Sequence, residues 1–382
     1  MLNQIETDAS TRRFQRKCYF QQTLKEAIPV KTAEDRSVAA LRKLLERVPF
    51  VQVLSAVGHP SRAADAVDLV VELRVDGHAH RLICERVENG QPRYARTALL
   101  KLRYFLTQHS PDATAIFIAP YISPAVQQLC IENGVSYLDL EGNTYLAFRG
   151  VFIERHEPHQ SVAETRGLKS LFKPKSGQVL RAMLREPSRV WRVAELSAHS
   201  GVSLGHVSNV RAGLLDRELA RASDQGFALK DPDALLDTWR DSYTAPAGQK
   251  LRFHTILHGR AFEDAVRSAL GVADPVGHAV LASYSAANWI CPYARIGMNF
   301  FFADELGLRR LQSALKLTST AKGENVIVTI PKDPSVLTDS IEPVPGAICT
   351  NLIQTYLDLS IGGERGAEAA DFLRQERLSW AR

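Results

Sequence analysis

The sequence predicts a multidomain α/β (α+β) protein in which a helical module separates two mixed regions. The chain has 382 residues, enough for two or three domains, because one domain usually holds roughly 100–200 residues. Strand-like apolar runs alternate with helical periodicity before residue 156 and again after residue 250, whereas residues 174–231 contain three helical patterns in succession. The middle of the chain therefore differs in class from its flanks.

The composition is that of a soluble protein, with 45% hydrophobic and 23% charged residues. No apolar run approaches the roughly 20 residues that span a bilayer. The basic N-terminus is not followed by an apolar segment, so it does not resemble a secretory signal. The five cysteines are widely spaced and form no CxxC pair. We therefore expect a cytoplasmic protein with no membrane partner, cofactor or metal centre.

Residues 1–34 are predicted to be an N-terminal extension, and a mixed α/β domain is predicted over residues 35–155. It opens with a helix at 37–49 and a strand at 51–57. Strands at 68–77 and 80–90 follow as an antiparallel pair, because Asp-Gly between apolar runs is a strong hairpin signal.

The rest of this region continues the alternation of helix and strand. An amphipathic helix at 95–109 precedes a wholly apolar strand at 113–120. Ser123 is predicted to be the N-cap of the next helix, which carries Pro in its first turn and ends at Gly134. Strands at 135–142 and 143–154 close the domain. The predicted order is α-β-β-β-α-β-α-β-β.

This order resembles the restriction-endonuclease core of the PD-(D/E)xK family, in which Asp, Glu and Lys hold magnesium and orient water. Asp68 opens one strand and Glu85 lies in the next, as that pattern requires. The position of the lysine is occupied by Val87, and Arg86, Arg93 and Arg96 are the alternative basic residues. The sequence favours an inactive, nuclease-like scaffold in which Asp68 and Glu85 are catalytic only if the domain is a nuclease.

Residues 156–173 are predicted to be a linker, and residues 174–243 a winged helix-turn-helix. Val179, Leu180, Met183 and Leu184 give a first helix its apolar face. Trp191, Val193 and Leu196 are predicted to start a second helix that ends at Gly201. A three-residue turn then leads to a third helix capped by Ser203, with Val207, Val210 and Leu214 inward. Residues 219–229, with a turn at Gln225-Gly226, are predicted to form the wing.

The third helix is predicted to be the recognition helix of a DNA-binding module. Small and hydrogen-bonding side chains at the start of such a helix permit close approach to base edges, and Asn and Arg can read adenine and guanine. The candidate DNA-binding residues, including basic residues before the first helix and on the wing, are Ser203, Gly205, His206, Ser208, Asn209, Arg211, Arg221, Lys173 and Lys175.

The charge distribution agrees with this assignment. The chain has a net charge of +5, yet residues 163–222 hold eleven Lys and Arg residues against five Asp and Glu residues. A basic surface confined to one module is typical of proteins that contact phosphates. A solvated basic face would look the same.

Residues 250–382 are predicted to form a C-terminal α/β domain after a joint at 245–250. Its predicted strands are 278–286, 295–303 and 324–331, and a final helix is predicted near 364–378. Tyr356 and Phe372 are predicted to be packing positions of the last helices.

Four segments of the chain resemble the AbiEi-type antitoxin and transcriptional-regulator family of bacterial abortive-infection (type IV) toxin-antitoxin systems. They are GVSYLDLEGNTYLAF at 134–148, ASYSAANWICPY at 282–293, ENVIVTIPKD at 324–333 and LIQTYLDLSIGGERGAEAADFLR at 352–374. The resemblance covers about residues 35–375. It implies a repressor of its own operon with a nucleotidyltransferase-like toxin as a partner. The larger N-terminal α/β domain departs from simpler members of the family.

The leading hypothesis is therefore a non-enzymatic, sequence-specific regulator that binds double-stranded DNA, with a C-terminal domain for partner binding or homodimer formation. Two alternatives stay open. The first is a magnesium-dependent nuclease that the winged helix targets to DNA, and the second is a protein-interaction module.

Overall fold

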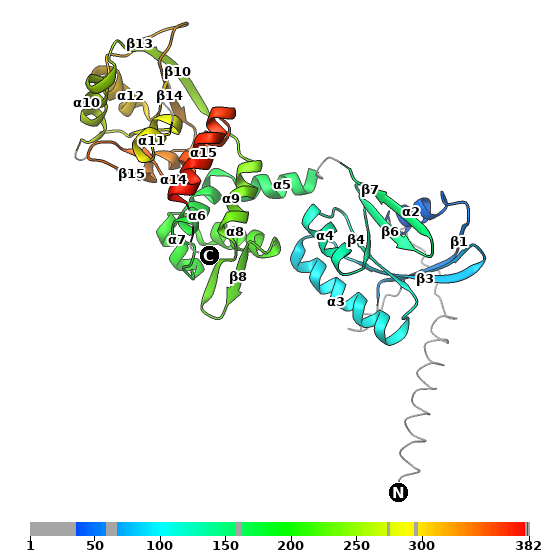
Figure 1. Ribbon diagram of the computed structural model, residues 1–382. Coiled ribbons are helices and arrows are strands. Elements are labelled where there is room, and N and C mark those ends of the chain that lie inside the picture. Colours follow the sequence, from blue (N-terminus) through cyan, green and yellow to red (C-terminus); the bar gives the residue numbers. More distant parts are fainter. Residues whose placement is uncertain are drawn as a thin grey trace. The chain divides into compact units, whose positions relative to one another are not determined.

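The computed structural model describes residues 36–58, 67–157, 162–272, 276–293, 297–378 and 380. The predicted N-terminal extension lies outside the described residues. The chain divides into two compact units, Met1–Ser161 and Val162–Arg382, which are called unit 1 and unit 2 (Figure 1). Each is described by itself.

Unit 1 is a seven-stranded mixed sheet with helices on both faces. Its helices are α2 (Arg36–Leu45), α3 (Pro92–His109) and α4 (Pro124–Glu132), and its strands are β1 (Val51–Gly58), β2 (Leu69–Val75), β3 (His78–Arg86), β4 (Thr114–Ala119), β5 (Ser136–Asp139), β6 (Thr144–Phe148) and β7 (Val151–Arg155). The strands lie in chain order from β1 to β7. β3, β4 and β5 pair in parallel, and the other neighbours are antiparallel. The predicted mixed α/β class is confirmed.

The alternation of apolar side chains divides the core of unit 1 into two layers. Ile83 and Phe117 point to the face that α3 and α4 cover, whereas Leu82 and Ile116 point to the face that α2 covers. Neighbouring residues of a strand face opposite sides, so strands buried on both faces become continuous apolar runs.

Two hairpin turns of unit 1 use left-handed backbone. Asp76 and Gly77 have φ of 48° and 80°, which is the conformation that a two-residue turn needs, and the predicted hairpin between β2 and β3 is correct. Arg149 and Gly150 have φ of 45° and 79°. The prediction of one strand over 143–154 is therefore wrong, because this second turn divides the segment into β6 and β7.

Unit 2 begins with the helical module. Its elements are α5 (Val162–Leu171), α6 (Pro174–Arg185), α7 (Val193–Ser200), α8 (Leu204–Asp216), β8 (Ala220–Ser223), β9 (Gly226–Leu229) and α9 (Pro232–Asp241). Helices α6, α7 and α8 are followed by the antiparallel hairpin of β8 and β9, which is the order of elements that the sequence predicts for this segment. The predicted linker at 156–173 is wrong over its second half, which forms α5 and packs Leu171 into the core.

Trp191 is not part of a helix, contrary to the prediction. It forms an isolated antiparallel bridge with Phe227 of β9, and helix α7 begins only at Val193. The backbone at Trp191 therefore pairs with the edge of the two-stranded wing. Gly226 permits this pairing, because a Cβ there would lie 2.3 Å from the Trp191 carbonyl oxygen.

The C-terminal part of unit 2 is a second seven-stranded mixed sheet with helices. The elements are β10 (Gly248–His254), α10 (Gly259–Leu270), β11 (Ala279–Leu281), α11 (Ser283–Ile290), β12 (Asn299–Ala303), α12 (Glu305–Ala314), β13 (Thr318–Ser319), β14 (Val326–Pro331), α13 (Ser335–Thr338), β15 (Ser340–Ile341), β16 (Cys349–Thr350), α14 (Leu352–Ser360) and α15 (Glu364–Arg377). The strand order is β13-β10-β14-β12-β11-β16-β15. The predicted strand at 278–286 is only three residues long, since α11 begins at Ser283.

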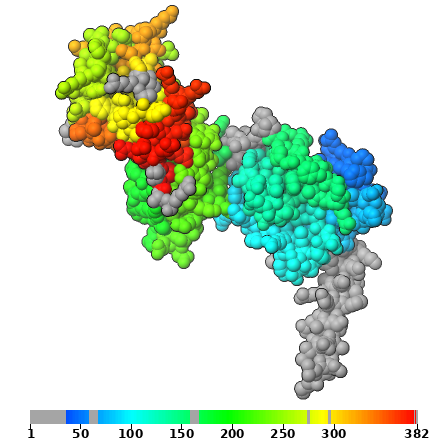
Figure 2. Space-filling model, in the orientation of Figure 1, coloured from blue at the N-terminus to red at the C-terminus, as the bar shows by residue number. Residues whose placement is uncertain are grey.

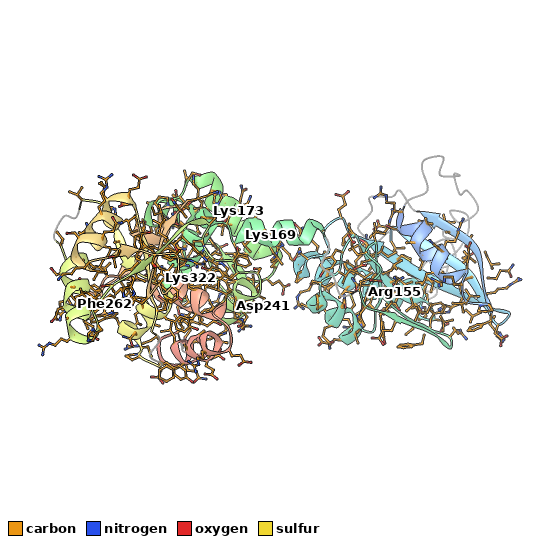
Figure 3. The ribbon with its side chains drawn as sticks, turned by 90° about the horizontal axis from the view of Figure 1, so that it is seen from above. Arg155, Lys169, Lys173, Asp241, Phe262 and Lys322 are labelled. Atoms are coloured by element: carbon orange, nitrogen blue, oxygen red, sulfur yellow. The ribbon has the colours of Figure 1, made fainter. Side chains whose placement is uncertain are left out.

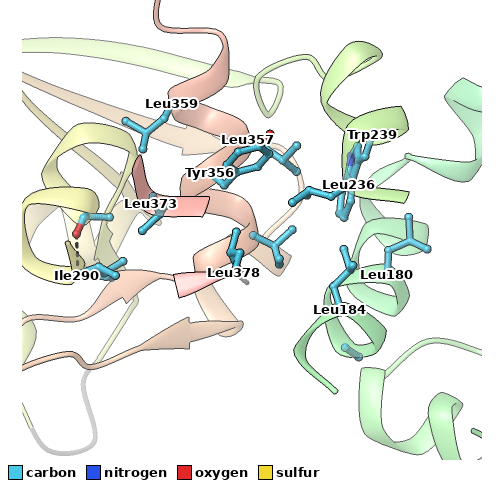
Figure 4. Packing of buried hydrophobic residues seen from close by; sticks show 14 of the residues in the cluster. Leu180, Leu184, Leu236, Trp239, Ile290, Tyr356, Leu357, Leu359, Leu373 and Leu378 are labelled. Carbon is cyan, nitrogen blue, oxygen red and sulfur yellow. Dashed lines mark hydrogen bonds between the residues drawn. The ribbon is translucent and has the colours of Figure 1, made fainter. Parts of the chain in front are cut away.

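One large hydrophobic cluster joins the helical module to the C-terminal part of unit 2, and a smaller cluster around Val280 and Phe302 lies within the C-terminal part. Leu180 and Trp239 of the helical module belong to the same cluster as Tyr356 and Leu357 of α14 and Leu378 after α15 (Figure 4). In the space-filling view, the green helical module and the red C-terminal helices pack directly against each other (Figure 2). The helical module and the C-terminal sheet therefore form one folded body.

Candidate nucleic-acid interface

Helix α8 presents an uncharged outer face of mostly small side chains. Val207, Val210 and Leu214 are buried on its inner side, whereas the outward residues of its first three turns are Leu204, Gly205, Ser208, Asn209 and Ala212. Its first acidic residue is Asp216, at the last helical position. This face is uncharged, and its two hydrogen-bonding side chains, Ser208 and Asn209, suit contact with base edges.

The turn before α8 fixes the direction of the helix. Gly201 has φ of 68° and ends α7 in the left-handed conformation that glycine adopts most easily. Ser203 occupies the N-cap position of α8, but its side chain accepts no capping hydrogen bond. The predicted N-cap position is correct, but the prediction that the Ser203 side chain caps the helix is wrong.

His206 does not face outward as predicted. Its Nε2 lies 3.0 Å from Ser176 Oγ in α6, and that hydroxyl donates to the Ser170 carbonyl oxygen. Since a hydroxyl has one proton to donate, His206 Nε2 donates to Ser176. His206 therefore joins the first turn of α8 to the start of α6, where the exposed Lys173 and Lys175 lie.

The two predicted arginines of the interface have different settings. The Arg211 guanidinium lies 5.7 Å from the centre of the Phe227 ring, so it is a half-buried neighbour of the wing. Arg221 of β8 is exposed, and so are Asp224 and Gln225 at the wing tip. The wing thus carries one predicted cation and one acid.

Part of the basic charge of the helical module is used inside unit 2. Arg181 and Arg185 of α6 both contact the Asp339 carboxylate, and Arg189 pairs with Glu186 and Glu195. These three cations do not contribute to a phosphate-binding surface. The other exposed Lys and Arg side chains among the described residues of the helical module are Lys169, Lys173, Lys175, Arg192, Arg221 and Lys230, of which Lys230 pairs with Glu218. Lys169 and Lys173 are labelled in Figure 3.

A buried polar network connects the helical module to α14. Arg181 is 3% exposed and donates to Asp339 Oδ2 at 2.8 Å and to Gln354 Oε1 at 3.4 Å. Gln354 Nε2 donates to Tyr243 Oη and to Asp358 Oδ1. Burial raises the pKa of the Asp358 carboxyl to about 7, because burial disfavours a charge.

A second cluster of polar groups lies in unit 1, where the sequence predicts Asp68 and Glu85. Asp68 Oδ2 accepts from the Arg86 backbone N–H at 2.8 Å. Glu85, in β3, is 7% exposed, and its Oε1 accepts from Lys101 Nζ of α3 at 2.6 Å. Glu85 Oε2 is buried and accepts no hydrogen bond from any described residue. The Val87 side chain packs against the core.

The electrostatics of this cluster raise the pKa of the Glu85 carboxyl. Burial raises the pKa of Glu85, the hydrogen bond from Lys101 lowers it, and the nearby Asp68 carboxylate raises it again, so that the net shift is upward. Two adjacent carboxyl groups and an amine are able to bind a hard cation or to exchange a proton with water.

Lys101 is the residue of this cluster that sequence reasoning missed. The family pattern places the lysine two residues after the glutamate, at Val87. A search for that spacing therefore cannot identify a lysine on the next helix. Lys101 reaches Glu85 because α3 packs on the face of the sheet that contains β3. The available signal was the position of Lys101 beside the buried Leu102 on an amphipathic helix.

No group of three His, Cys, Asp or Glu side chains that could hold a metal ion occurs in the described part of the chain. None of the helices described there combines the length and apolar composition that crossing a bilayer needs.

Comparisons with known proteins give few matches. No known protein family and no curated protein matches this chain. Solved structures that match include a complex of EndoMS with double-stranded DNA (15% identity, 30% of this chain and 48% of that one, TM-score 0.20). A repair endonuclease from Pyrococcus abyssi (15%, 29% and 49%, 0.21) and EndoMS without DNA (16%, 28% and 48%, 0.20) match similarly. This chain spans about half the length of each, and its fold class rests on its own strand order.

Proposed function

We propose that the protein is a sequence-specific DNA-binding regulator that reads duplex DNA with α8. The observation that carries the proposal is the outer face of α8, which has no acidic residue before Asp216 and is flanked by the exposed Lys173 and Lys175. Hydrogen-bonding side chains on a helix whose direction is set by the preceding turn suit contact with the major groove. The exposed lysines suit contact with phosphates.

A mobility-shift titration with the duplex upstream of the gene tests this proposal. Asn209→Ala should weaken specific binding by roughly 1–3 kcal/mol, as expected for one lost bidentate base contact. Arg260→Ala is the matched control, since this side chain is 93% exposed on α10. Equal affinity of the Asn209→Ala protein and the wild type would show that α8 is not the recognition helix.

The proposal extends to autoregulation as the AbiEi resemblance implies it. A reporter fused to the protein's own promoter should be repressed when the protein is supplied and released by Asn209→Ala. Co-expression with the neighbouring gene product tests the antitoxin role. If reporter expression from this promoter does not change when the protein is supplied, the proposal of DNA binding still stands but the proposal of autoregulation is wrong.

A magnesium-dependent nuclease at Asp68 and Glu85 is the second candidate function, favoured by the pairing of Glu85 with Lys101. The residues fit a cation, because Glu85 Oε2 is buried without a protein partner and magnesium commonly takes only one or two carboxylates. Asp68 and Glu85 would hold the ion, which when bound would activate water and polarise a phosphate. Lys101 would hold Glu85 in place and keep it ionised.

Two readouts separate this candidate from an inactive scaffold. Calorimetric titration with Mg²⁺ should show binding that Glu85→Gln abolishes, and plasmid DNA should be nicked only when magnesium is present. Wild-type protein that neither binds the ion nor cuts DNA would support the prediction of an inactive nuclease-like domain.

A further inference from the structure

Helix α3 of unit 1 has an unusual composition. Its eighteen residues, Pro92–His109, include no Asp or Glu. The nearest acidic residues along the chain are Glu88 and Asp112, beyond either end of the helix. The helix carries four permanent cations, which are Arg93, Arg96, Lys101 and Arg103.

The outer face of α3 also exposes large apolar and aromatic side chains. Tyr94, Leu100 and Tyr104 are 39%, 69% and 54% exposed. The two tyrosines are ten residues apart, which is about 15 Å along the helix axis. Tyr94, Thr97, Lys101 and Tyr104 follow the three- and four-residue spacing of a single helix stripe, so both rings lie on the side of α3 that carries Lys101.

We propose that this face of α3 binds single-stranded nucleic acid. The exposed tyrosine rings would stack on unpaired bases while the exposed arginine side chains of α3 face the phosphates, the combination on which single-strand binding depends. The positive charge of this face favours a polyanion over an apolar protein as the partner. The exposed tyrosine rings favour a single strand over a duplex, because the bases of a duplex already stack on each other.

Lys101 bonds Glu85 at 2.6 Å, so the stripe borders the part of unit 1 that holds Glu85. Helix α8 of unit 2 has no aromatic residue and therefore lacks stacking groups. The two surfaces differ in chemistry, and this inference does not depend on the proposed duplex binding by α8.

Fluorescence anisotropy with a fluorescein-labelled oligothymidylate and the full-length protein tests the inference. Replacing both tyrosines by alanine (Tyr94→Ala with Tyr104→Ala) should weaken binding roughly tenfold or more, because each stacked base contributes substantially. The corresponding phenylalanine pair should bind like the wild type, since the ring is kept. Phe50→Ala is the matched control, because Phe50 is 48% exposed in the same unit.

A charge variant keeps the test decisive if the alanine pair does not fold. Arg103→Glu, at an exposed position, should lower the affinity and flatten its salt dependence, whereas Asn209→Ala in α8 should leave oligothymidylate binding unchanged. Unchanged binding in a folded alanine pair or in Arg103→Glu would overturn the inference. A loss in Phe50→Ala equal to that in the alanine pair would also overturn it.

Discussion

Asp358 is a carboxyl group that folding places in an unfavourable setting. It is held by hydrogen bonds from Tyr243 Oη and Gln354 Nε2, and Arg181 and Lys250 act on it from a distance. Burial outweighs these favourable partners and raises its pKa from 3.8 to about 7. Burial likewise raises the pKa of Tyr243, so the pair favours its protonated forms.

This shift makes the stability of unit 2 depend on pH. Between about pH 4 and pH 7 the folded state holds a proton on Asp358 that the unfolded state has released, so the free energy of unfolding falls as pH rises through this window. Asp358→Asn keeps the acceptor and removes the titration. Chemical unfolding at several pH values should show that, as pH rises through this window, the free energy of unfolding of the wild type falls by a few kcal/mol relative to that of the variant. The same pH dependence in both proteins would contradict the assignment of this titration to Asp358.

Lys101 and Glu85 give a second prediction. Lys101→Met leaves Glu85 buried without its cation, which should lower the stability of unit 1 by about 1–3 kcal/mol and raise the pKa of Glu85 further. Thermal unfolding at neutral pH measures the loss. Adding Glu85→Gln should recover part of it, because the amide carries no charge, and the exposed Lys43→Met on α2 is the matched control.

Two glycines flank the start of α8, and replacing them by alanine should have opposite effects on stability. Gly201 has φ of 68°, so Gly201→Ala should destabilise unit 2 by about 1 kcal/mol through backbone strain. Gly205 lies in the helix, and a Cβ there meets no atom within 4 Å, so Gly205→Ala should stabilise the helix by up to about 1 kcal/mol.

The same pair separates folding from binding. In urea unfolding, Gly205→Ala should appear more stable than the wild type, yet it should bind duplex DNA less tightly because its methyl group stands on the proposed contact face. Greater stability together with unchanged DNA affinity would remove Gly205 from that face.

The elements could be predicted wherever their cause is local. Asp76-Gly77 is a turn that two residues specify by their own backbone preferences, and the hairpin around it was predicted correctly. Arg149-Gly150 forms the same type of turn, but arginine is not a preferred residue for a positive φ, so the segment was predicted as one strand. Ser283, likewise at a φ of 49°, gives no sequence signal that β11 stops and α11 begins.

The parts of the site that sequence reasoning missed depend on contacts between distant residues. Trp191 pairs with Phe227, thirty-six positions later, and neither residue alone indicates a strand. His206 appears outward on a helical wheel and is drawn inward by Ser176. Lys101 reaches Glu85 from another element. Periodicity describes one element at a time, whereas these three contacts arise when elements pack together.

At the scale of the whole molecule, the helical module and the C-terminal part of unit 2 share one large hydrophobic cluster, which predicts how the unit tolerates truncation. A fragment that ends at residue 244 would expose Leu180 and Trp239, which pack against the cluster containing Tyr356, and would leave Arg181 without Asp339 and Gln354. We expect this fragment to lack a cooperative unfolding transition, whereas residues 162–382 unfold cooperatively. Circular dichroism during denaturation distinguishes the two. A fragment that ends at residue 244 and melts cooperatively would show that the helical module is a separate domain.

The order of the strands has a further consequence for synthesis of the chain. In unit 1 every strand pairs with its predecessor in the sequence, so its contacts are local and the entropy cost of closing loops is small. In unit 2, β10 pairs with β14, so it cannot form this pairing until about seventy further residues have been synthesised. The ribosome releases unit 1 first, and domains generally fold as units in that order. We expect unit 1 to complete its sheet while unit 2 is still being translated, so that the slower, non-local sheet is assembled last and with the nascent chain already half folded.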